Sequence, residues 1–162
     1  MIGDDLLAEA ERLLARCRER GARLATAESC TGGLIAATLT AIAGSSDVVD
    51  RGFITYSNEA KIEMLGVSAG LIAQAGAVSE EVAAAMAEGA VHKSRASLAV
   101  SVTGVAGPGG ASATKPVGLV CFGLARRDGE AISERRILPG NRAQVRAGAV
   151  AHAFAMIRGL LA

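Results

Sequence analysis

The sequence has few aromatic residues and almost no excess of charge. It contains no tryptophan, one tyrosine and three phenylalanines in 162 residues, so it has too few aromatic side chains to stack on single-stranded nucleic acid. Its 17 basic and 16 acidic side chains leave a formal net charge of +1. A strongly basic footprint is therefore missing, although a local basic patch is compatible with this balance. We expect no nucleic-acid partner.

Metal-binding and membrane signatures are also missing. The three cysteines form no CxxC pair and only two histidines accompany them, so we expect reduced thiols and no metal site. No apolar run reaches the roughly 18–20 residues that a membrane span needs. The acidic, amphipathic residues 1–14 are unlike a signal peptide. These features predict a soluble, cytoplasmic protein without a membrane partner.

The apolar residues, 51% of the chain, are mainly Ala, Val, Leu and Ile and can form a sizeable core. Their periodicity and an Asp-Gly hairpin signal predict one α/β domain over residues 1–162, with a mixed, mostly parallel sheet and helices on both faces. A C-terminal hairpin and a last helix complete it. Expected helices cover 5–20, 34–44, 58–66, 68–75, 80–94 and 141–162, and expected strands cover 23–27, 48–57, 96–103, 117–125 and 131–138. Expected markers are Asp4 or Asp5 and Asn58 as helix N-caps, Gly21 as a helix end, and Gly52 as a bulge or a point of close approach.

Polar residues gather where the expected strands end. Four such segments occur, at Glu28–Gly33, Thr55–Lys61, Thr103–Lys115 and Gly140–Arg146. Because the carboxyl ends of parallel strands meet at one edge of a sheet, we expect these segments to form a common site.

Ser29 lies between an expected strand and a helix that begins after two glycines. Backbone N–H groups at such a turn can stabilise an oxyanion, which makes Ser29 a candidate nucleophile. Alternatively, Ser29 or Thr31 merely caps the helix. The turn lacks the G-x-S-x-G pattern, and neither histidine has a partnering context, so a Ser-His-Asp triad is not indicated.

Lys61 is one of only three lysines and falls in the first turn of an expected helix. The helix dipole and burial would both lower its pKa and allow it to act as a base. Alternatively, it is an exposed lysine paired with Glu59 or Glu63. The Tyr56 hydroxyl could orient Lys61 or relay a proton, or Tyr56 could be an ordinary residue of the rim.

Two further segments could bind an anion. The glycine-rich loop from Gly104 to Gly110 could wrap backbone donors around a phosphate or an acyl oxygen, although it matches neither the Walker A nor the GxGxxG motif. Arg142 and Arg146 could hold a phosphate in bidentate fashion, or they could pair with surface glutamates.

Seven motifs in this order resemble the CinA C-terminal domain family, whose stand-alone members are nicotinamide-nucleotide amidases (PncC). The resemblance extends from about Leu6 to Leu160. The motifs are TAESCTGGL (26–34), GSS (44–46), RGFITYSNEAK (51–61), GAVS (76–79), TGVAGPGG (103–110), KPVG (115–118) and GNR (140–142).

The resemblance implies a three-layer α/β fold, a cytoplasmic location, a homodimer, and hydrolysis of nicotinamide mononucleotide to nicotinate mononucleotide and ammonia without a cofactor. It implies that Ser29 is the nucleophile, Lys61 its base and Tyr56 an assisting residue. It also implies an oxyanion and ribose-phosphate site lined by Thr31, Gly32, Thr103, Gly104 and Gly107, with Arg142 as a phosphate clamp.

The sequence departs from the family pattern at Ala111–Thr114, where a further glycine and threonine are expected, so loop shape and substrate fit there stay open. We also expect no counterpart of the larger N-terminal pyrophosphatase-like domain of two-domain relatives, so its activity is not carried over. The alternative function is a non-catalytic nucleotide-binding or competence-associated interaction module. Retention of Ser29, Tyr56 and Lys61 together favours the amidase.

Overall fold

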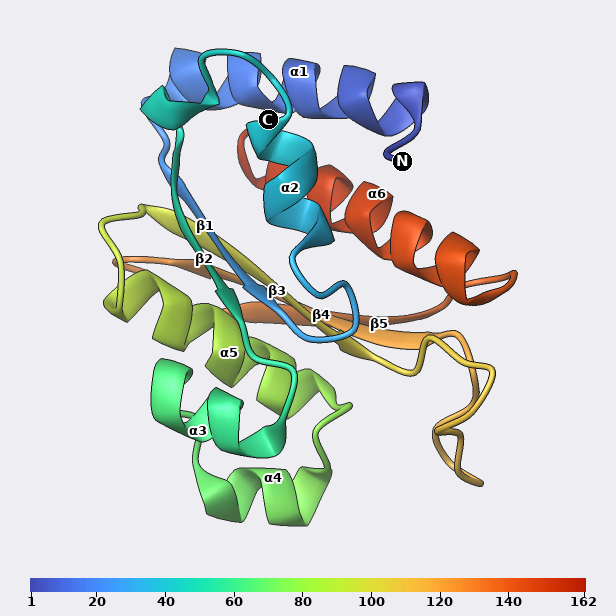
Figure 1. Cartoon of the computed structure of the whole chain (residues 1–162). Coiled ribbons are helices and arrows are strands. Elements are labelled where there is room, and N and C mark those ends of the chain that lie inside the picture. The colour runs from blue at the N-terminus through green and yellow to red at the C-terminus, as the bar shows by residue number, and fades with distance from the viewer.

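A computed structural model describes residues 1–162 and shows a five-stranded sheet between two layers of helices (Figure 1). Helices α1, α2 and α6 cover one face of the sheet, and α3, α4 and α5 cover the other (Figure 1). The helices are α1 (Asp4–Arg20), α2 (Leu34–Thr40), α3 (Asn58–Leu65), α4 (Ala69–Ala75), α5 (Glu80–His92) and α6 (Arg142–Leu160), with a 3-10 turn η1 (Ser45–Asp47). The strands are β1 (Leu24–Glu28), β2 (Val49–Ile54), β3 (Leu98–Gly104), β4 (Leu119–Arg126) and β5 (Ile132–Ile137).

The sheet has the order β2-β1-β3-β4-β5 and mixes both strand directions. β1 runs parallel to β2 and to β3, whereas the β3–β4 and β4–β5 pairings are antiparallel. The expected mixed α/β sheet, its helices on both faces and its C-terminal hairpin and helix are confirmed. Its parallel part is the three strands β1, β2 and β3, whose carboxyl ends lie at one edge.

Two apolar layers hold the helices against the sheet. The larger has 24 buried residues, including Phe122 and Phe154, and packs α1, α2 and α6 onto the sheet. The smaller has 13 buried residues and packs α5 onto the other face. β1, β3 and β4 are almost completely buried because both layers cover them, whereas the edge strands β2 and β5 are largely exposed. None of the helices combines the length and the apolar character needed to cross a bilayer.

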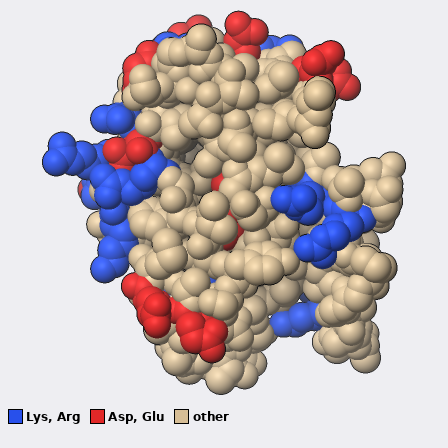
Figure 2. All heavy atoms as spheres, viewed as in Figure 1, with Lys and Arg blue, Asp and Glu red and all other residues tan.

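Charged side chains lie in small groups on the surface. Figure 2 shows basic and acidic groups spread over one face, with no single sign covering it. This distribution agrees with the balanced composition of the chain.

Several element ends differ from the expected ones by a few residues. α1 begins after Gly3, so Asp4 and Asp5 lie in its first turn and do not cap it, while Gly21 ends it in the left-handed conformation as expected. The N-cap of α3 is Ser57 and not Asn58, because the Ser57 hydroxyl accepts a hydrogen bond from the Ala60 N–H. This cap places Lys61 one turn into α3, facing the carboxyl ends of the parallel strands.

α2 is shorter than expected and ends at Thr40, ahead of Gly44. Gly52 is a point of close approach, since a Cβ there would lie 2.7 Å from the Thr26 hydroxyl oxygen and 3.3 Å from the Ala36 Cβ. The absence of a side chain at Gly52 therefore lets α2 lie close to β2.

Candidate active site

The polar segments meet at the carboxyl ends of β1, β2 and β3, as their positions predict. They line a cavity of about 220 Å³. Its lining comes from the turn after β1, the β2–α3 connection, the segment before α5, the end of β3 and the start of α6. The lining residues are Ser29, Cys30, Tyr56, Asn58, Lys61, Ala77, Val78, Thr103, Gly104, Ala106 and Arg142.

Ser29 and Lys61 are in direct contact in this cavity. The Lys61 Nζ lies 3.1 Å from the Ser29 Oγ and donates to the Thr55 carbonyl at 2.8 Å. The carbonyls of Tyr56 and Ser57 lie at 3.4 and 3.5 Å from the same amine. The backbone between β2 and α3 thus curls around the amine and directs it toward the serine.

Lys61 is buried without a carboxylate partner. It is 1% exposed and takes part in none of the ion pairs of the structure, so its pairing with Glu59 or Glu63 is excluded. Burial lowers the pKa of the Lys61 amine below its ordinary value of 10.5, and the nearby Cys30 thiol opposes this shift. A lysine with a lowered pKa can offer its lone pair to the serine hydroxyl.

Cys30 also lines the cavity but is chemically quiet. Burial raises the pKa of its thiol to about 11, and the negative charge of Glu28 contributes to the increase. The reactive form of cysteine is the thiolate, which is scarce at neutral pH when the pKa is this high. Ser29 is therefore the better nucleophile of the two neighbours.

Glu28, the last residue of β1, is fully buried and was not identified from the sequence. Its carboxylate accepts hydrogen bonds from the N–H groups of Ile35 and Ala36 in the first turn of α2. These two N–H groups are therefore engaged within the protein, and only N–H groups of the turn itself remain for a ligand. The Thr31 hydroxyl donates to the same carboxylate and is buried, so this side chain lies away from the cavity lining.

The Tyr56 hydroxyl lies at the mouth of the cavity and not on Lys61. Its side chain contacts Arg142, whose guanidinium donates to the phenolic oxygen at 3.1 Å and to the Gly107 carbonyl at 2.9 Å. Tyr56 is 62% exposed, and it reaches Lys61 only through its backbone carbonyl. The idea that the hydroxyl orients Lys61 is therefore wrong in this conformation.

The remaining predicted residues surround the serine turn. Thr103 and Gly104 line the cavity, and the Thr103 hydroxyl donates to the Ala77 carbonyl at 2.8 Å. Gly32 is exposed and, like Gly107, lies outside the lining. Arg146 donates to the carbonyls of residues 30 and 31, at 3.2 and 3.0 Å. Both arginines at the start of α6 therefore bind backbone carbonyls, and neither pairs with a glutamate.

A second cavity of about 480 Å³ adjoins the first and shares Ala106 and Arg142 with it. Its other lining residues include Gly140, Asn141 and Ala143 at the start of α6. Arg142 lies at the boundary between the two cavities. This is a suitable position for a cation that binds one end of an elongated anionic ligand.

The fold and the site define an α/β domain with a buried serine–lysine pair at the carboxyl ends of its parallel strands. Hydrolases without a histidine base use this combination to activate a serine.

The chain belongs to the CinA C-terminal domain family, whose model matches residues 7–161. It is 49% identical over 154 residues to an Escherichia coli K12 protein named nicotinamide-nucleotide amidohydrolase PncC, covering 95% of this chain and 93% of that protein. It is 51% identical over 158 residues to a CinA-like protein of Mycolicibacterium vanbaalenii, covering 98% of this chain. The chain spans only 36% of that longer relative.

A solved structure has the same fold. The crystal structure of the competence/damage inducible protein CihA from Agrobacterium tumefaciens superposes with a TM-score of 0.94 at 47% identity. The match covers 99% of this chain and 98% of that one. The three-layer arrangement is therefore the fold of the family.

Proposed function

We propose that this protein is an amidohydrolase that converts nicotinamide mononucleotide and water into nicotinate mononucleotide and ammonia. The observation that carries the proposal is the 3.1 Å contact between the Ser29 hydroxyl and a buried Lys61 amine that has no ion-pair partner. The choice of substrate rests on the relative named nicotinamide-nucleotide amidohydrolase, which this chain matches over 93% of its length.

The first half of the reaction forms an ester with Ser29. The Ser29 Oγ attacks the carboxamide carbon while its proton passes to the Lys61 Nζ. The tetrahedral intermediate then expels the amide nitrogen, which takes the proton from Lys61 and leaves as ammonia. Its negative oxygen needs N–H donors, and the backbone N–H groups of Cys30 and Thr31, which donate to no backbone carbonyl, are our candidates.

The second half returns the enzyme to its starting state. Lys61 accepts a proton from a water molecule as the water oxygen attacks the ester carbon. The bond to the Ser29 Oγ then breaks, the serine recovers its proton from Lys61, and the acid product ionises to a carboxylate. The pyridinium cation of the substrate makes the carbonyl carbon more electrophilic, which eases both attacks.

We propose that the two adjoining cavities hold the two parts of the substrate. We place the nicotinamide ring in the smaller cavity beside Ser29, and the ribose phosphate in the larger one. Arg142 lies between them and would bind the phosphate through its guanidinium. Thr103 and Gly104 would line the smaller cavity, the Gly107 carbonyl would hold Arg142 in place, and Tyr56 would contact Arg142 from the other side. Three expectations stay predictions: a homodimer, a single domain over residues 1–162 and a cytoplasmic location. Sedimentation tests the dimer, limited proteolysis tests the single domain, and cell fractionation tests the location.

The decisive experiment measures ammonia release from nicotinamide mononucleotide by chelator-treated protein, with Ser29→Ala and Lys61→Ala as variants. We expect turnover by the parent and its loss in both variants, together with an acyl-enzyme mass adduct in the parent. Turnover that survives Ser29→Ala would contradict the covalent mechanism but keep the amidase. Binding of the nucleotide without turnover would favour the non-catalytic binding module.

A further inference from the structure

The carboxylate of Glu28 directly precedes the proposed nucleophile, yet the proposed reaction gives it no chemical step. Its side chain is 0% exposed and accepts four hydrogen bonds. They come from the Thr31 Oγ1 at 2.6 Å, the Ile35 N at 2.8 Å, the Ala36 N at 3.0 Å and the Thr26 Oγ1 at 3.1 Å. All four partners can donate, which is the environment that an ionised carboxylate needs when it is buried.

Through these bonds the Glu28 carboxylate occupies the amino terminus of α2. The first N–H groups of a helix have no partner within the helix, and together with the helix dipole they attract negative charge. In α2 two of these groups, those of Ile35 and Ala36, already bind Glu28. A ligand anion therefore has no access to them, and the helix terminus serves the internal order of the site.

The backbone of Glu28 connects the two halves of the proposed catalytic pair. Its carbonyl accepts from the Thr55 N–H at 2.8 Å, and the Thr55 carbonyl in turn accepts from the Lys61 Nζ at 2.8 Å. On the other side, the Ser29 N–H donates to the Val102 carbonyl of β3 at 3.0 Å. Glu28 is thus linked through its backbone to the lysine and through its side chain to the serine turn.

We propose that Glu28 is a positioning residue of the reaction: its carboxylate ties α2 and Thr31 to the end of β1, and so holds the Ser29 hydroxyl within reach of Lys61. This inference rests on the proposed amidase function. A displacement of about 1 Å in a reacting group can cost about 100-fold in rate, so loss of the carboxylate affects turnover more than substrate binding.

The variant Glu28→Gln tests this role because it keeps the shape of the side chain. Its amide NH2 replaces one oxygen and faces a backbone N–H of α2, donor against donor. We expect kcat to fall by about 10- to 100-fold while KM stays within about twofold. The acidic limb of the pH profile should stay in place, because Lys61 remains the base.

Two further variants grade the effect by removing one donor each. Thr31→Val deletes the shortest hydrogen bond to the carboxylate and Thr26→Val the longest, without changing the shape of either side chain. We expect the fall in kcat to decrease in the order Glu28→Gln, Thr31→Val, Thr26→Val. These two variants also carry the test if Glu28→Gln fails to fold.

The control for general destabilisation is Ile157→Val, near the far end of α6. Ile157 is buried in the larger core layer and lies 15 residues along the helix from Arg142, or about 22 Å at the rise of an α-helix. A variant that lowers the melting temperature here should leave kcat unchanged. If kcat in the graded series follows only the fraction of folded protein, as in this control, the positioning role is overturned.

Labelling of Ser29 by a fluorophosphonate, followed by intact mass, separates this inference from the proposed function. The probe reports on serine reactivity without needing turnover. If the parent reacts with the probe but releases no ammonia, the proposed substrate is wrong, and the labelling rates of the graded series still decide the role of Glu28. Equal labelling rates in the parent and Glu28→Gln would overturn it.

Discussion

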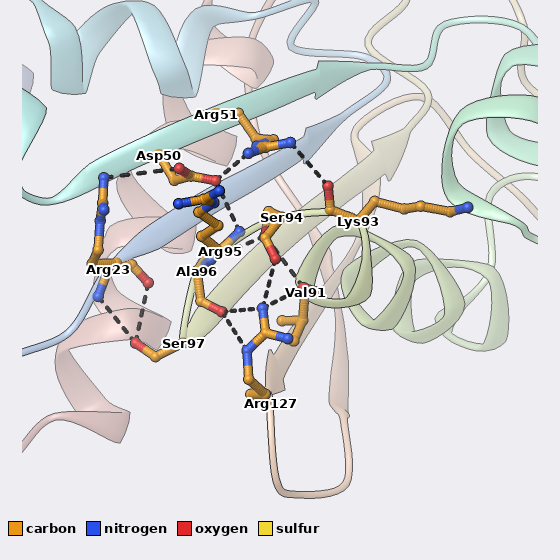
Figure 3. A network of polar contacts seen from close by, with 10 residues as sticks. All are labelled: Arg23, Asp50, Arg51, Val91, Lys93, Ser94, Arg95, Ala96, Ser97 and Arg127. Atoms are coloured by element: carbon orange, nitrogen blue, oxygen red, sulfur yellow. Dashed lines mark hydrogen bonds and ion pairs between the residues drawn. The ribbon is translucent and has the colours of Figure 1, made fainter.

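Both ends of the parallel strands carry polar side chains and use them in opposite ways. At the amino ends, the close-up in Figure 3 shows a network in which Asp50 pairs with Arg23 and Arg51 and the Arg127 side chain points at backbone carbonyls. The Arg127 guanidinium donates to the carbonyls of Val91, Ser94 and Ala96 and so caps the end of α5. Asp50 accepts from the Arg51 side chain and from the Arg95 N–H. At the carboxyl ends, Lys61 is buried with no carboxylate beside it.

Cavity size does not distinguish the two ends, because the carboxyl ends hold a cavity of about 480 Å³ as well as the one of about 220 Å³ beside Ser29. The cavity at the amino ends measures about 440 Å³ and is lined by Arg20, Arg126 and Arg127 among others, twice the volume of the cavity beside Ser29. Its arginines, however, include Arg127, whose guanidinium already donates to backbone carbonyls at and after the end of α5. A buried amine that touches a hydroxyl is the better indicator of chemistry, because its burial is costly unless the group is used.

The largest expected difference between the two ends concerns their serines. Ser29→Ala should lower kcat by about 1000-fold or more with no loss of stability, since it removes the nucleophile. Ser97→Ala, at the amino ends, removes contacts with the Arg23 backbone and should cost about 1 kcal/mol of stability with kcat unchanged. Ammonia release measures kcat and urea unfolding measures stability in both variants. Equal losses of kcat would contradict the assignment of the chemistry to the carboxyl ends.

Lys61→Arg keeps the positive charge and should still lower kcat by about 100-fold or more, because a guanidinium does not give up its proton at ordinary pH.

In the parent, the lowered pKa of Lys61 means that kcat falls as the pH drops through that pKa. The same shift penalises the folded state fully below the folded pKa, and the penalty disappears as the pH rises toward the unfolded value of about 10.4.

The stability of the parent relative to Lys61→Met should therefore rise with pH over the window between those two pKa values. Urea unfolding of both proteins at neutral and alkaline pH checks the sign, since the other titrating groups cancel in the difference. A constant difference would show that Lys61 keeps its ordinary pKa.

The arginines of the two ends form the next matched pair. Arg142→Ala should raise KM by about 10- to 100-fold, the value of one or two charge-assisted hydrogen bonds to a phosphate, with little change in stability. Arg127→Ala should lower stability by about 1–2 kcal/mol and leave KM unchanged, because it uncaps the end of α5. Steady-state kinetics and unfolding decide, and an exchange of the two effects would contradict the assignment.

The smallest expected effect concerns Thr55, at the carboxyl end of β2. The Thr55 hydroxyl is the one buried side-chain polar atom without a hydrogen-bond partner. Thr55→Val keeps the shape and removes the unsatisfied group, so stability should rise by up to about 1 kcal/mol while kcat stays within twofold. A large fall in kcat would instead give this hydroxyl a part in the reaction.

Much of this arrangement could be predicted from the sequence, because it follows from strand order and turn chemistry. Ser29 and Lys61 each follow a strand that joins a parallel pair, and such strand ends meet whatever their separation along the chain. The Asp-Gly pair predicted the hairpin between β4 and β5 correctly. The predicted N-cap of α3, Asn58, is one residue away from the observed one, Ser57, because both residue types are good N-caps.

Side-chain directions were harder to predict. Glu28 ends strand β1, where an acid is ordinarily exposed, and its burial depends on the turn folding back so that α2 offers its N–H groups. The Tyr56 hydroxyl turns toward Arg142, which lies 86 residues further along the chain. The Tyr56–Arg142 contact depends on how distant elements pack, whereas the partners of the Glu28 carboxylate lie within eight residues of it and depend on the conformation of the turn.

The neutralised end of α2 also bears on product release. The proposed reaction replaces an uncharged carboxamide by a carboxylate, so the product carries a negative charge that the substrate lacks at that position. Because the Glu28 carboxylate already binds the first N–H groups of α2, that charge finds no helix terminus to hold it. The carboxylate of the product therefore meets only the groups around Ser29, and the helix terminus adds nothing to inhibition by product.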